Sequence, residues 1–372
     1  MKRFTAVAVS LGLTAFATLS FAGSANAAGE QLTFDLKMPP AGKTLYKEAP
    51  KPVMWSTETK ITVPPGSSTI EPLQALNLEM PTELSFNPDP NMPVCPDSAV
   101  NATTVSVPVE TIIAACPNSI IGNGDSEFAL AQQTALDRKG AMLAFNGGYE
   151  NGNPRVMIYA YSYDTEVGLY TEAVLKKNGE LYFPVPPLTA DSSVTELNLN
   201  IPGVPMSIDF PAKGITANLP AGQDPNYALA TCKSDSWDWS GAFVLGDRPE
   251  GLPPGPTTTL TDSGTTACTG AAGKAKFASI KIKGPGSVKA GKKGTYKVKI
   301  KNNGTATAKK VKLKVTGKGV SGKASGGNIA PGKSKTVKVK VKFAKKGKIK
   351  ATFKATAAKT AAKSGKKTVK VK

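Results

Sequence analysis

The stretch that decides the fold of the second half of the chain is Tyr296-Lys297-Val298-Lys299-Ile300. The same alternation returns in Val337-Lys338-Val339-Lys340-Val341-Lys342-Phe343. Successive side chains of an extended strand point to opposite faces, so the apolar residues fall on one face and the lysines on the other. Both stretches are therefore predicted to be β-strands with one buried face and one lysine-covered face.

Shorter alternating segments surround these two. Strands are expected at residues 279–283, 311–315, 349–357 and 368–372, and turn signals separate them: Gly284-Pro285-Gly286, Asn302-Asn303-Gly304, Gly326-Gly327-Asn328 and Pro331-Gly332. Six or seven short strands in about 100 residues predict an immunoglobulin-like β-sandwich. The alternative is a disordered lysine tail, which is considered only for the last stretch from about Lys359.

Residues 286–342 resemble the CARDB modules, the cell-adhesion-related domains of bacteria. The features that carry the resemblance are the turn Asn302-Asn303-Gly304 after the second strand and Pro331-Gly332 before a later one. The resemblance implies a β-sandwich that serves as a spacer or an adhesive repeat in surface and secreted proteins. It indicates the fold more specifically than the function.

Charge divides the 372-residue chain near residue 273. Residues 274–372 contain 32 lysines and no Asp, Glu or Arg, whereas residues 28–273 contain 13 Lys and Arg against 27 acidic residues, a net charge of −14. The small residues Thr269–Gly273 at the join are typical of a flexible linker. We therefore expect an acidic β-rich domain at residues 28–268, a linker at 269–277 and a basic domain at 278–372.

The N-terminus has the parts of a secretory signal peptide. Met1-Lys2-Arg3 precedes an apolar run from Phe4 to Gly23, and Ala25-Asn26-Ala27 supplies an A-x-A cleavage site. The alternative is an anchoring transmembrane helix. We predict a signal peptide at residues 1–27, no transmembrane span after cleavage, and a secreted protein that is extracellular or associated with the cell envelope.

In that compartment the four cysteines are expected to be oxidised. They allow three pairings, and proximity in the sequence favours Cys95 with Cys116 and Cys232 with Cys268. A zinc site is the competing idea, but the sequence has no C-x-x-C spacing. No metal and no cofactor are expected.

The acidic half is also expected to be all-β, as a sandwich or a distorted barrel. The 36 glycines and 29 prolines of the whole chain disfavour long helices, although one short helix around Val109–Ala115 is possible. The segments that read as strands are residues 60–63, 127–131, 141–145, 156–162, 180–185, 193–200 and 237–245.

A second resemblance covers the acidic half. Leu84-Ser85-Phe86-Asn87, Met92-Pro93-Val94-Cys95 and the run from Cys116-Pro117 to Gly124 are similar to a group of uncharacterised secreted actinobacterial proteins. Their shared pattern is P-x-C followed by C-P-x-S-x-I-G-x-G, with β-rich sequence and two more cysteines after it. The pairing of Cys95 with Cys116 fits that pattern. The resemblance implies no activity.

Two tryptophans and two acids gather after Cys232 in Asp235-Ser236-Trp237-Asp238-Trp239. Exposed tryptophans two residues apart could stack on sugar rings while Asp235 and Asp238 accept hydrogen bonds from sugar hydroxyls. Trp237 and Trp239 also share parity with Phe243, which favours a place in the core. Both interpretations stay open at this point.

Catalysis has little support in the sequence. Histidine is absent, which excludes Ser-His and Cys-His nucleophile systems and imidazole zinc sites. The pairs Asp235 with Asp238 and Asp125 with Glu127 are candidates for a glycosidase, but no motif supports them. Gly122–Glu127 could offer oxygen ligands to calcium, although it lacks the D-x-D-x-D-G spacing. We expect a protein that is not an enzyme.

The leading hypothesis is a secreted, non-catalytic protein of the cell envelope whose lysine-rich module is adhesive or an electrostatic anchor to anionic polymers or surfaces. The lysines expected to bind a polyanion are Lys297, Lys299, Lys312, Lys314, Lys338, Lys340 and Lys342. Charge for solubility alone is the simpler explanation. No aromatic residues interleave the lysines in a base-stacking pattern, so sequence-specific nucleic-acid binding is not expected. An extracellular glycan-binding protein is the alternative, and a secreted hydrolase is third.

Overall fold

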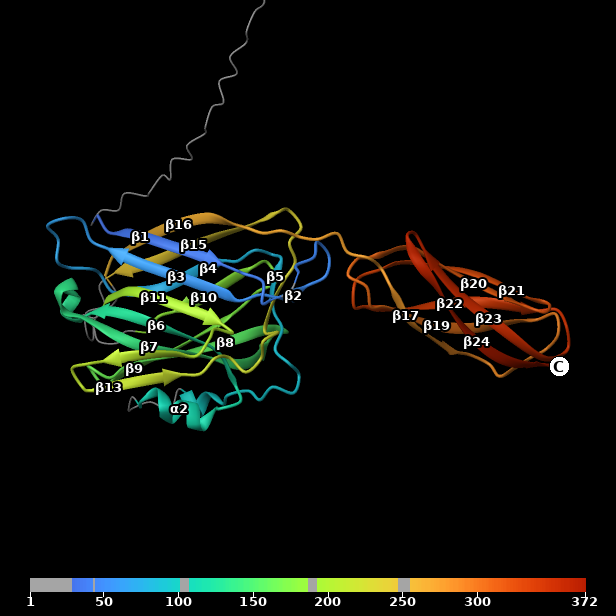
Figure 1. Ribbon diagram of the computed structural model, residues 1–372, viewed down its shortest axis with the longest axis horizontal. Helices are drawn as coiled ribbons and strands as arrows, with labels where there is room; N and C mark the ends of the chain where they lie inside the picture. The colour runs from blue at the N-terminus through green and yellow to red at the C-terminus, as the bar shows by residue number, and fades with distance from the viewer. Residues whose placement is uncertain (1–28, 43, 101–106, 187–192, 247–254) are drawn as a thin grey trace, which may run out of the picture.

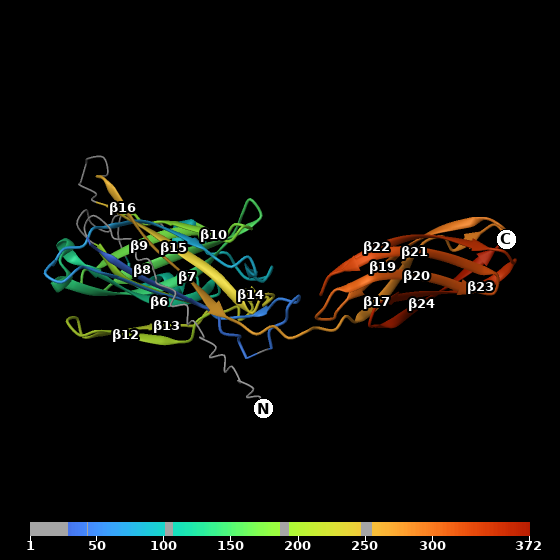
Figure 2. The same cartoon turned by 90° about the horizontal axis from the view of Figure 1, so that it is seen from above.

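The computed structural model describes residues 29–42, 44–100, 107–186, 193–246 and 255–372. The predicted signal peptide, residues 1–27, lies outside the described residues. The described chain is nearly all β, as the sequence predicted. It forms two bodies that lie end to end (Figures 1 and 2). Within these ranges, no helix combines the length and the apolar character needed to cross a membrane.

The acidic domain is built on two antiparallel sheets. The larger sheet has the order β1 (Gln31–Lys37), β3 (Trp55–Thr62), β11 (Ser193–Ile201), β6 (Ile120–Ala129), β7 (Asp137–Glu150), β8 (Asn153–Ser162) and β9 (Val167–Val174). The smaller sheet has the order β10 (Glu180–Pro184), β4 (Leu73–Glu79), β15 (Ser236–Gly246) and β16 (Thr257–Ala267). Apolar side chains from both inner faces form the main core.

The two sheets meet along both edges, which makes the sandwich a flattened barrel. At the β1–β16 edge, Phe34 N–H donates to Asp262 Oδ2 at 2.9 Å, and the Thr266 hydroxyl donates to the carbonyl of Leu36. At the β9–β10 edge, the Thr171 hydroxyl donates to the carbonyl of Pro184. Side-chain hydrogen bonds therefore close the seams where the backbone ladder is interrupted.

A third layer covers the outer face of β6, β7 and β8. It consists of the hairpin β12 (Met206–Phe210) and β13 (Ile215–Leu219) with the short helices α1 (Asp97–Val100) and α2 (Val109–Ala115). The hairpin lies below the main sheet in Figure 2. The disulfide between Cys95 and Cys116 joins the chain on either side of the helices. The short helix expected at Val109–Ala115 is present.

Several small elements complete the domain. They are the sheet β2 (Lys51–Pro52), β14 (Ala228–Ala230) and β5 (Leu84–Phe86), and the single 3₁₀ turns η1 (Leu130–Gln132) and η2 (Thr134–Leu136). The second disulfide, Cys232–Cys268, joins the segment before β15 to the end of β16. Both disulfides are the pairs that the spacing favoured.

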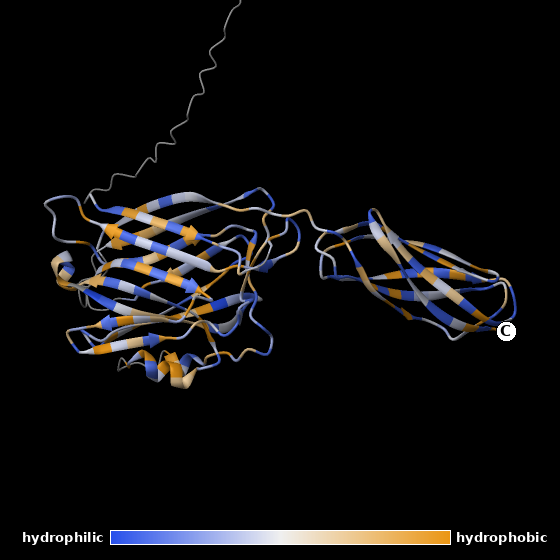
Figure 3. Ribbon diagram, in the orientation of Figure 1, coloured by the Kyte–Doolittle hydropathy of each residue, from blue (hydrophilic) through white to orange (hydrophobic). Residues whose placement is uncertain are grey.

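The basic domain is a single curled sheet that closes into an Ig-like sandwich. Its order is β17 (Phe277–Lys283), β19 (Lys293–Asn302), β22 (Ser334–Phe343), β21 (Val320–Ile329), β20 (Ala308–Gly317), β23 (Gly347–Ala357), β24 (Thr360–Val371) and β18 (Ser287–Val288). β17 packs beside β24, which brings the two ends together. Figure 3 shows the alternation of polar and apolar residues along these strands.

One expectation for the basic domain is wrong, and one alternative is excluded. Gly326-Gly327-Asn328 was predicted to be a turn, but it lies in β21, where Gly326 packs against Val311 and Val337. The chain from Lys359 is not a disordered tail, because β24 pairs with β23 over nearly its whole length. Both segments are poor in large apolar residues, and backbone pairing to a neighbouring strand holds them instead.

The expected linker, residues 269–277, is held by both domains rather than free. On one side, Lys47 N–H donates to the carbonyl of Ala271, and Ala271 N–H donates to the carbonyl of Leu45. On the other side, Thr305 N–H donates to the carbonyl of Lys274 at 2.9 Å. The small residues of this segment allow such close backbone contacts, and its flexibility stays a prediction.

Candidate polyanion-binding groove

Strand register places the outward lysines of the basic domain in rows that run across the strands. Lys293 on β19 is opposite Lys342 on β22, which is opposite Ser321 on β21, and Ser321 is opposite Thr316 on β20. A second row contains Lys323, Lys314 and Lys354 on β21, β20 and β23. Neighbouring strands are about 4.8 Å apart, so each row forms a short, regularly spaced band of charge and hydroxyls.

Apart from Lys354, the residues of these rows line a groove of about 380 Å³ over β19, β22, β21 and β20. Its charged residues are Lys293, Lys314, Lys323, Lys340 and Lys342, and its hydroxyls are those of Thr316 and Ser321. We call these seven residues the lysine groove. All five lysines are exposed. The polar side chains of the groove are therefore all ammonium donors or hydroxyls, as an anion with several acceptor oxygens requires.

The electrostatics of the groove favour an anion. Lys293 faces Lys342, Lys314 faces Lys323, and like charges directly opposite on neighbouring strands destabilise a sheet. Residues 274–372 contain no acidic side chain that could neutralise them. A bound polyanion would reduce this repulsion and gain attraction to every lysine in reach.

The seven lysines predicted from the alternation are all exposed, but the structure separates them. Lys314, Lys340 and Lys342 belong to the lysine groove. Another two, Lys297 and Lys338, form a row farther along β19 and β22. Outside the groove, Lys299 is opposite Lys281 and Thr336, and Lys312 is opposite Ser325 and Thr356.

Sequence reasoning missed two groove lysines, Lys293 and Lys323. Lys293 has the same parity as Lys297 and Lys299, so extending the alternation toward the N-terminus would have found it. Lys323 lies on β21, whose glycine-rich sequence concealed the strand. Its place in the groove depends on the pairing of β21 with β20, which alternation alone does not reveal.

The two tryptophans considered for glycan stacking lie in the core of the acidic domain. Trp237 is 2% exposed and Trp239 is 8% exposed. Trp237 Nε1 donates to the carbonyl of Thr231 at 2.8 Å, and the Trp239 ring packs edge-on against Phe34. Their faces are unavailable for stacking on a sugar, so their burial agrees with the core interpretation that parity with Phe243 favoured and not with glycan binding.

The accompanying acids point elsewhere. Asp235 lies in a left-handed turn with φ of 68° and forms an ion pair of 3.5 Å with Lys47. Asp238 is exposed on the outer face of β15, in a shallow polar groove that also contains Glu79 and Ser240. Alternation along β15 therefore separates Asp238 from the buried tryptophan faces.

The segment considered for calcium, Gly122–Glu127, is the interior of β6 and not a loop. A Cβ at Gly124 would lie 1.9 Å from the carbonyl oxygen of Asn198, so glycine is required for the close approach of β11. Asp125 accepts a hydrogen bond of 3.0 Å from Asn198 Nδ2, and burial raises the pKa of Asp125. In the described ranges, no three His, Cys, Asp or Glu side chains gather in a way that could hold a metal ion.

The sequence of the basic domain matches a known family. The CARDB family model matches residues 279–364, which extend from β17 into β24. Residues 279–364 are a CARDB domain. The match includes the lysine groove and does not include the acidic domain. For the acidic domain, the resemblance to secreted actinobacterial proteins stays a prediction. No curated protein matches the sequence.

Two solved structures are similar to the chain only at a low level. Domains 1–6 of the surface layer protein SbsC are 11% identical, with a TM-score of 0.20, and the match covers 91% of this chain and 54% of that one. Escherichia coli alpha-2-macroglobulin activated by porcine elastase is 9% identical, with a TM-score of 0.19, and the match covers 91% of this chain and 44% of that one. The chain thus spans about half of each structure, and scores this low support no inference about function.

Proposed function

We propose that the protein is a secreted, non-catalytic component of the cell envelope and that the lysine groove of its CARDB domain anchors it to an anionic envelope polymer. The observation that carries the proposal is the convergence of five exposed lysines from four adjacent strands on one groove. The CARDB domain and the two disulfides are consistent with an extracellular, adhesion-type protein.

The charge and the spacing of the lysines favour binding to a polymer with repeated negative charges. A mixed surface of both signs serves solubility better than lysine alone, so solubility does not require a domain with 32 lysines and no acid. A polymer with regularly spaced phosphates or carboxylates can contact several lysines of one row at once. Attraction of this kind is long-ranged and depends strongly on salt.

Binding of the full chain to purified cell walls and to poly(glycerol phosphate) tests the proposal. We expect binding at 50 mM NaCl that weakens steeply toward 500 mM. Lys314→Gln/Lys340→Gln/Lys342→Gln should lose at least tenfold more affinity than Lys281→Gln/Lys283→Gln/Lys289→Gln, which removes the same charge outside the groove. Equal losses in the two variants would contradict the groove, and no binding by the unaltered protein at low salt would overturn the proposal.

A further inference from the structure

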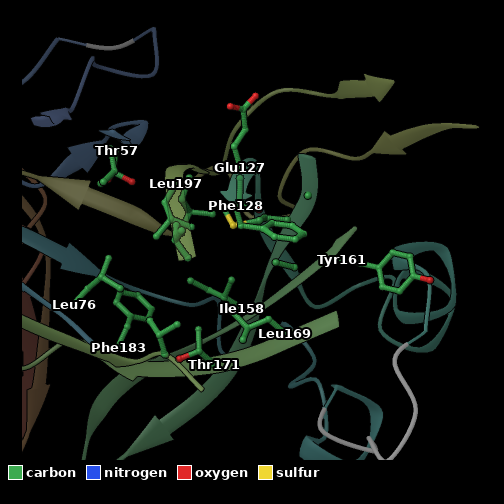
Figure 4. A pocket seen from close by; sticks show the side chains of 18 of the residues that line it. Thr57, Leu76, Glu127, Phe128, Ile158, Tyr161, Leu169, Thr171, Phe183 and Leu197 are labelled. Atoms are coloured by element: carbon green, nitrogen blue, oxygen red, sulfur yellow. The ribbon is translucent and has the colours of Figure 1, made fainter. Parts of the chain in front are cut away.

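The two sheets of the acidic domain enclose an apolar cavity of about 90 Å³. Figure 4 shows its walls, with Leu76 and Phe183 from the smaller sheet facing side chains of the larger sheet across open space. The labelled residues of the larger sheet that border this space are Phe128, Ile158, Leu169 and Leu197. Glu127 also belongs to the wall, but its side chain points away from the space. The interior of the barrel is therefore not completely filled by its own side chains.

Small residues at neighbouring inward positions account for the space. Ser126 on β6 is opposite Gly140 on β7, and the next inward residue of β7, Met142, is opposite Ala160 on β8. Protein cores normally pack without voids larger than a water molecule. An unfilled apolar volume destabilises a fold unless something occupies it.

A polar group lies in the wall of this apolar cavity. Ser162 is 1% exposed, and its Oγ has no hydrogen-bond partner among the described residues. Ile158, Ala160 and Ser162 share one parity on β8, so their side chains follow one another along the cavity wall. Ser162 is the last residue of the strand, which places its hydroxyl toward the end of the barrel. A buried hydroxyl without a partner is costly, and an oxygen of a ligand would satisfy it.

We propose that this cavity binds a short, unbranched alkyl chain that ends in a hydroxyl or carbonyl group. The alkyl part lies against Leu76, Ile158 and Phe183, and the terminal oxygen forms a hydrogen bond with the hydroxyl of Ser162. An apolar cavity of about 150 Å³ takes benzene, so a volume of about 90 Å³ selects a narrower molecule. The apolar walls exclude charged and strongly hydrated ligands.

The test uses the full chain with 1-propanol and propane as probes, both of which are smaller than benzene. In methyl-labelled protein, both probes should give saturable shifts and intermolecular NOEs at the methyl groups of Ile158 and Leu169. Ala160→Leu fills the cavity and should weaken the binding of both probes at least tenfold. Ser162→Ala keeps the cavity and should weaken the binding of 1-propanol severalfold while leaving propane unchanged, and Ser207→Ala on the exposed hairpin is the matched control.

The proposal can be contradicted by the unaltered protein as well as by the variants. Absence of NOEs from Ile158 and Leu169 to either probe in the unaltered protein would overturn the proposal, whether or not Ala160→Leu folds. Binding that Ala160→Leu leaves unchanged in a correctly folded protein would place the probes elsewhere and would also overturn it. Equal effects of Ser162→Ala on 1-propanol and propane would contradict the hydrogen bond assigned to Ser162.

Discussion

The carboxylate of Glu48 in the acidic domain accepts a hydrogen bond of 2.7 Å from the backbone N–H of Thr307 in the CARDB domain. The hydrogen bonds from the side chain and the backbone of Thr307 lower the pKa of Glu48, and the charge of Lys309 acts in the same direction. With the backbone bonds of Ala271 and Lys274, this contact holds the two domains together beside the linker.

Replacing Glu48 by Ala should loosen the domains without unfolding either. The side chain is exposed, so the melting temperatures should stay within about 1 °C, because surface contacts contribute little to stability. Cleavage by thermolysin within residues 269–277 should become several times faster. Glu150→Ala, an exposed acid at the β7–β8 turn, is the control and should cleave like the unaltered protein.

The same contact should depend on pH in a defined direction. A lowered carboxyl pKa stabilises the contact fully above the ordinary value of 4.5, and this contribution is lost as the pH falls through the lowered value. Small-angle scattering should therefore report an unchanged maximum dimension from pH 7 to pH 5 and an increase only after the pH has fallen below the ordinary carboxyl value of 4.5. An increase already between pH 7 and pH 5 would contradict the role of Glu48.

The two disulfides should differ in their effect on the linker. Cys232–Cys268 spans 36 residues and ends beside the linker, where Cys232 N–H donates to the carbonyl of Tyr46. Replacing both cysteines by Ser should cost about 4 kcal/mol of unfolding free energy, measured by urea titration, and should also speed linker cleavage. The Cys95→Ser/Cys116→Ser variant should cost about 3 kcal/mol and leave the linker protected.

The fold of the CARDB domain could be predicted well because burial alternates strictly along strands such as β19 and β22. The strand β21 could not be predicted, because its small residues do not alternate with apolar ones and its pairing depends on the tertiary structure. These small residues are Ser321, Gly322, Gly326 and Gly327. In the acidic domain, β8 and β15 stood out by their aromatic and β-branched residues. β16 did not, because its Thr- and Ser-rich sequence is mostly exposed.

The sequence could predict that lysines cover an exposed face, but not which of them share one groove. Parity correctly put Lys314 and Lys340 on exposed faces, yet only the register of β20, β21 and β22 brings them to one groove. Parity also supplied the correct interpretation of Trp237 and Trp239, which are part of the core. The cavity beside Ala160 had no signal in the sequence, because a small residue marks a void only when its neighbours across the sheet are known.

Glu30 should destabilise the acidic domain at neutral pH. Its side chain is buried, Oε1 accepts a hydrogen bond of 2.8 Å from Glu71 N–H, and Oε2 has no partner within the described ranges. Burial raises the pKa of Glu30, and the nearby charge of Glu71 adds to the effect. A raised carboxyl pKa adds to the free energy of unfolding at low pH, where the carboxyl is protonated. This contribution is lost as the pH rises through the pKa that the carboxyl has in the folded state.

Glu30→Gln should therefore raise the unfolding free energy by about 1 kcal/mol at pH 7 and change it little at pH 4, since the amide stays neutral at both. Urea titrations at the two pH values measure the difference. Glu150→Gln should show no gain at either pH. A gain for Glu30→Gln that is equal at both pH values would point to packing rather than to the buried charge.

Repulsion between the lysine rows should make the CARDB domain respond to salt. Lys297 faces Lys338, Lys314 faces Lys354, and residues 274–372 have no acid to offset them. Raising NaCl from 10 to 300 mM screens these contacts, so the slowest-exchanging amides of β19 and β22 in the full chain should gain protection. The amides of β6 and β7 in the acidic domain serve as the internal control.

At 10 mM NaCl, poly(glycerol phosphate) should protect the amides of β19 and β22 further, because a ligand that binds only the folded state adds about 2.7 kcal/mol of stability at a concentration 100 times its Kd. Protection by the polymer should be smaller in Lys314→Gln/Lys340→Gln/Lys342→Gln. If neither salt nor polymer changes the exchange of β19 and β22, the lysine rows do not repel one another appreciably and are no more than a solvated face.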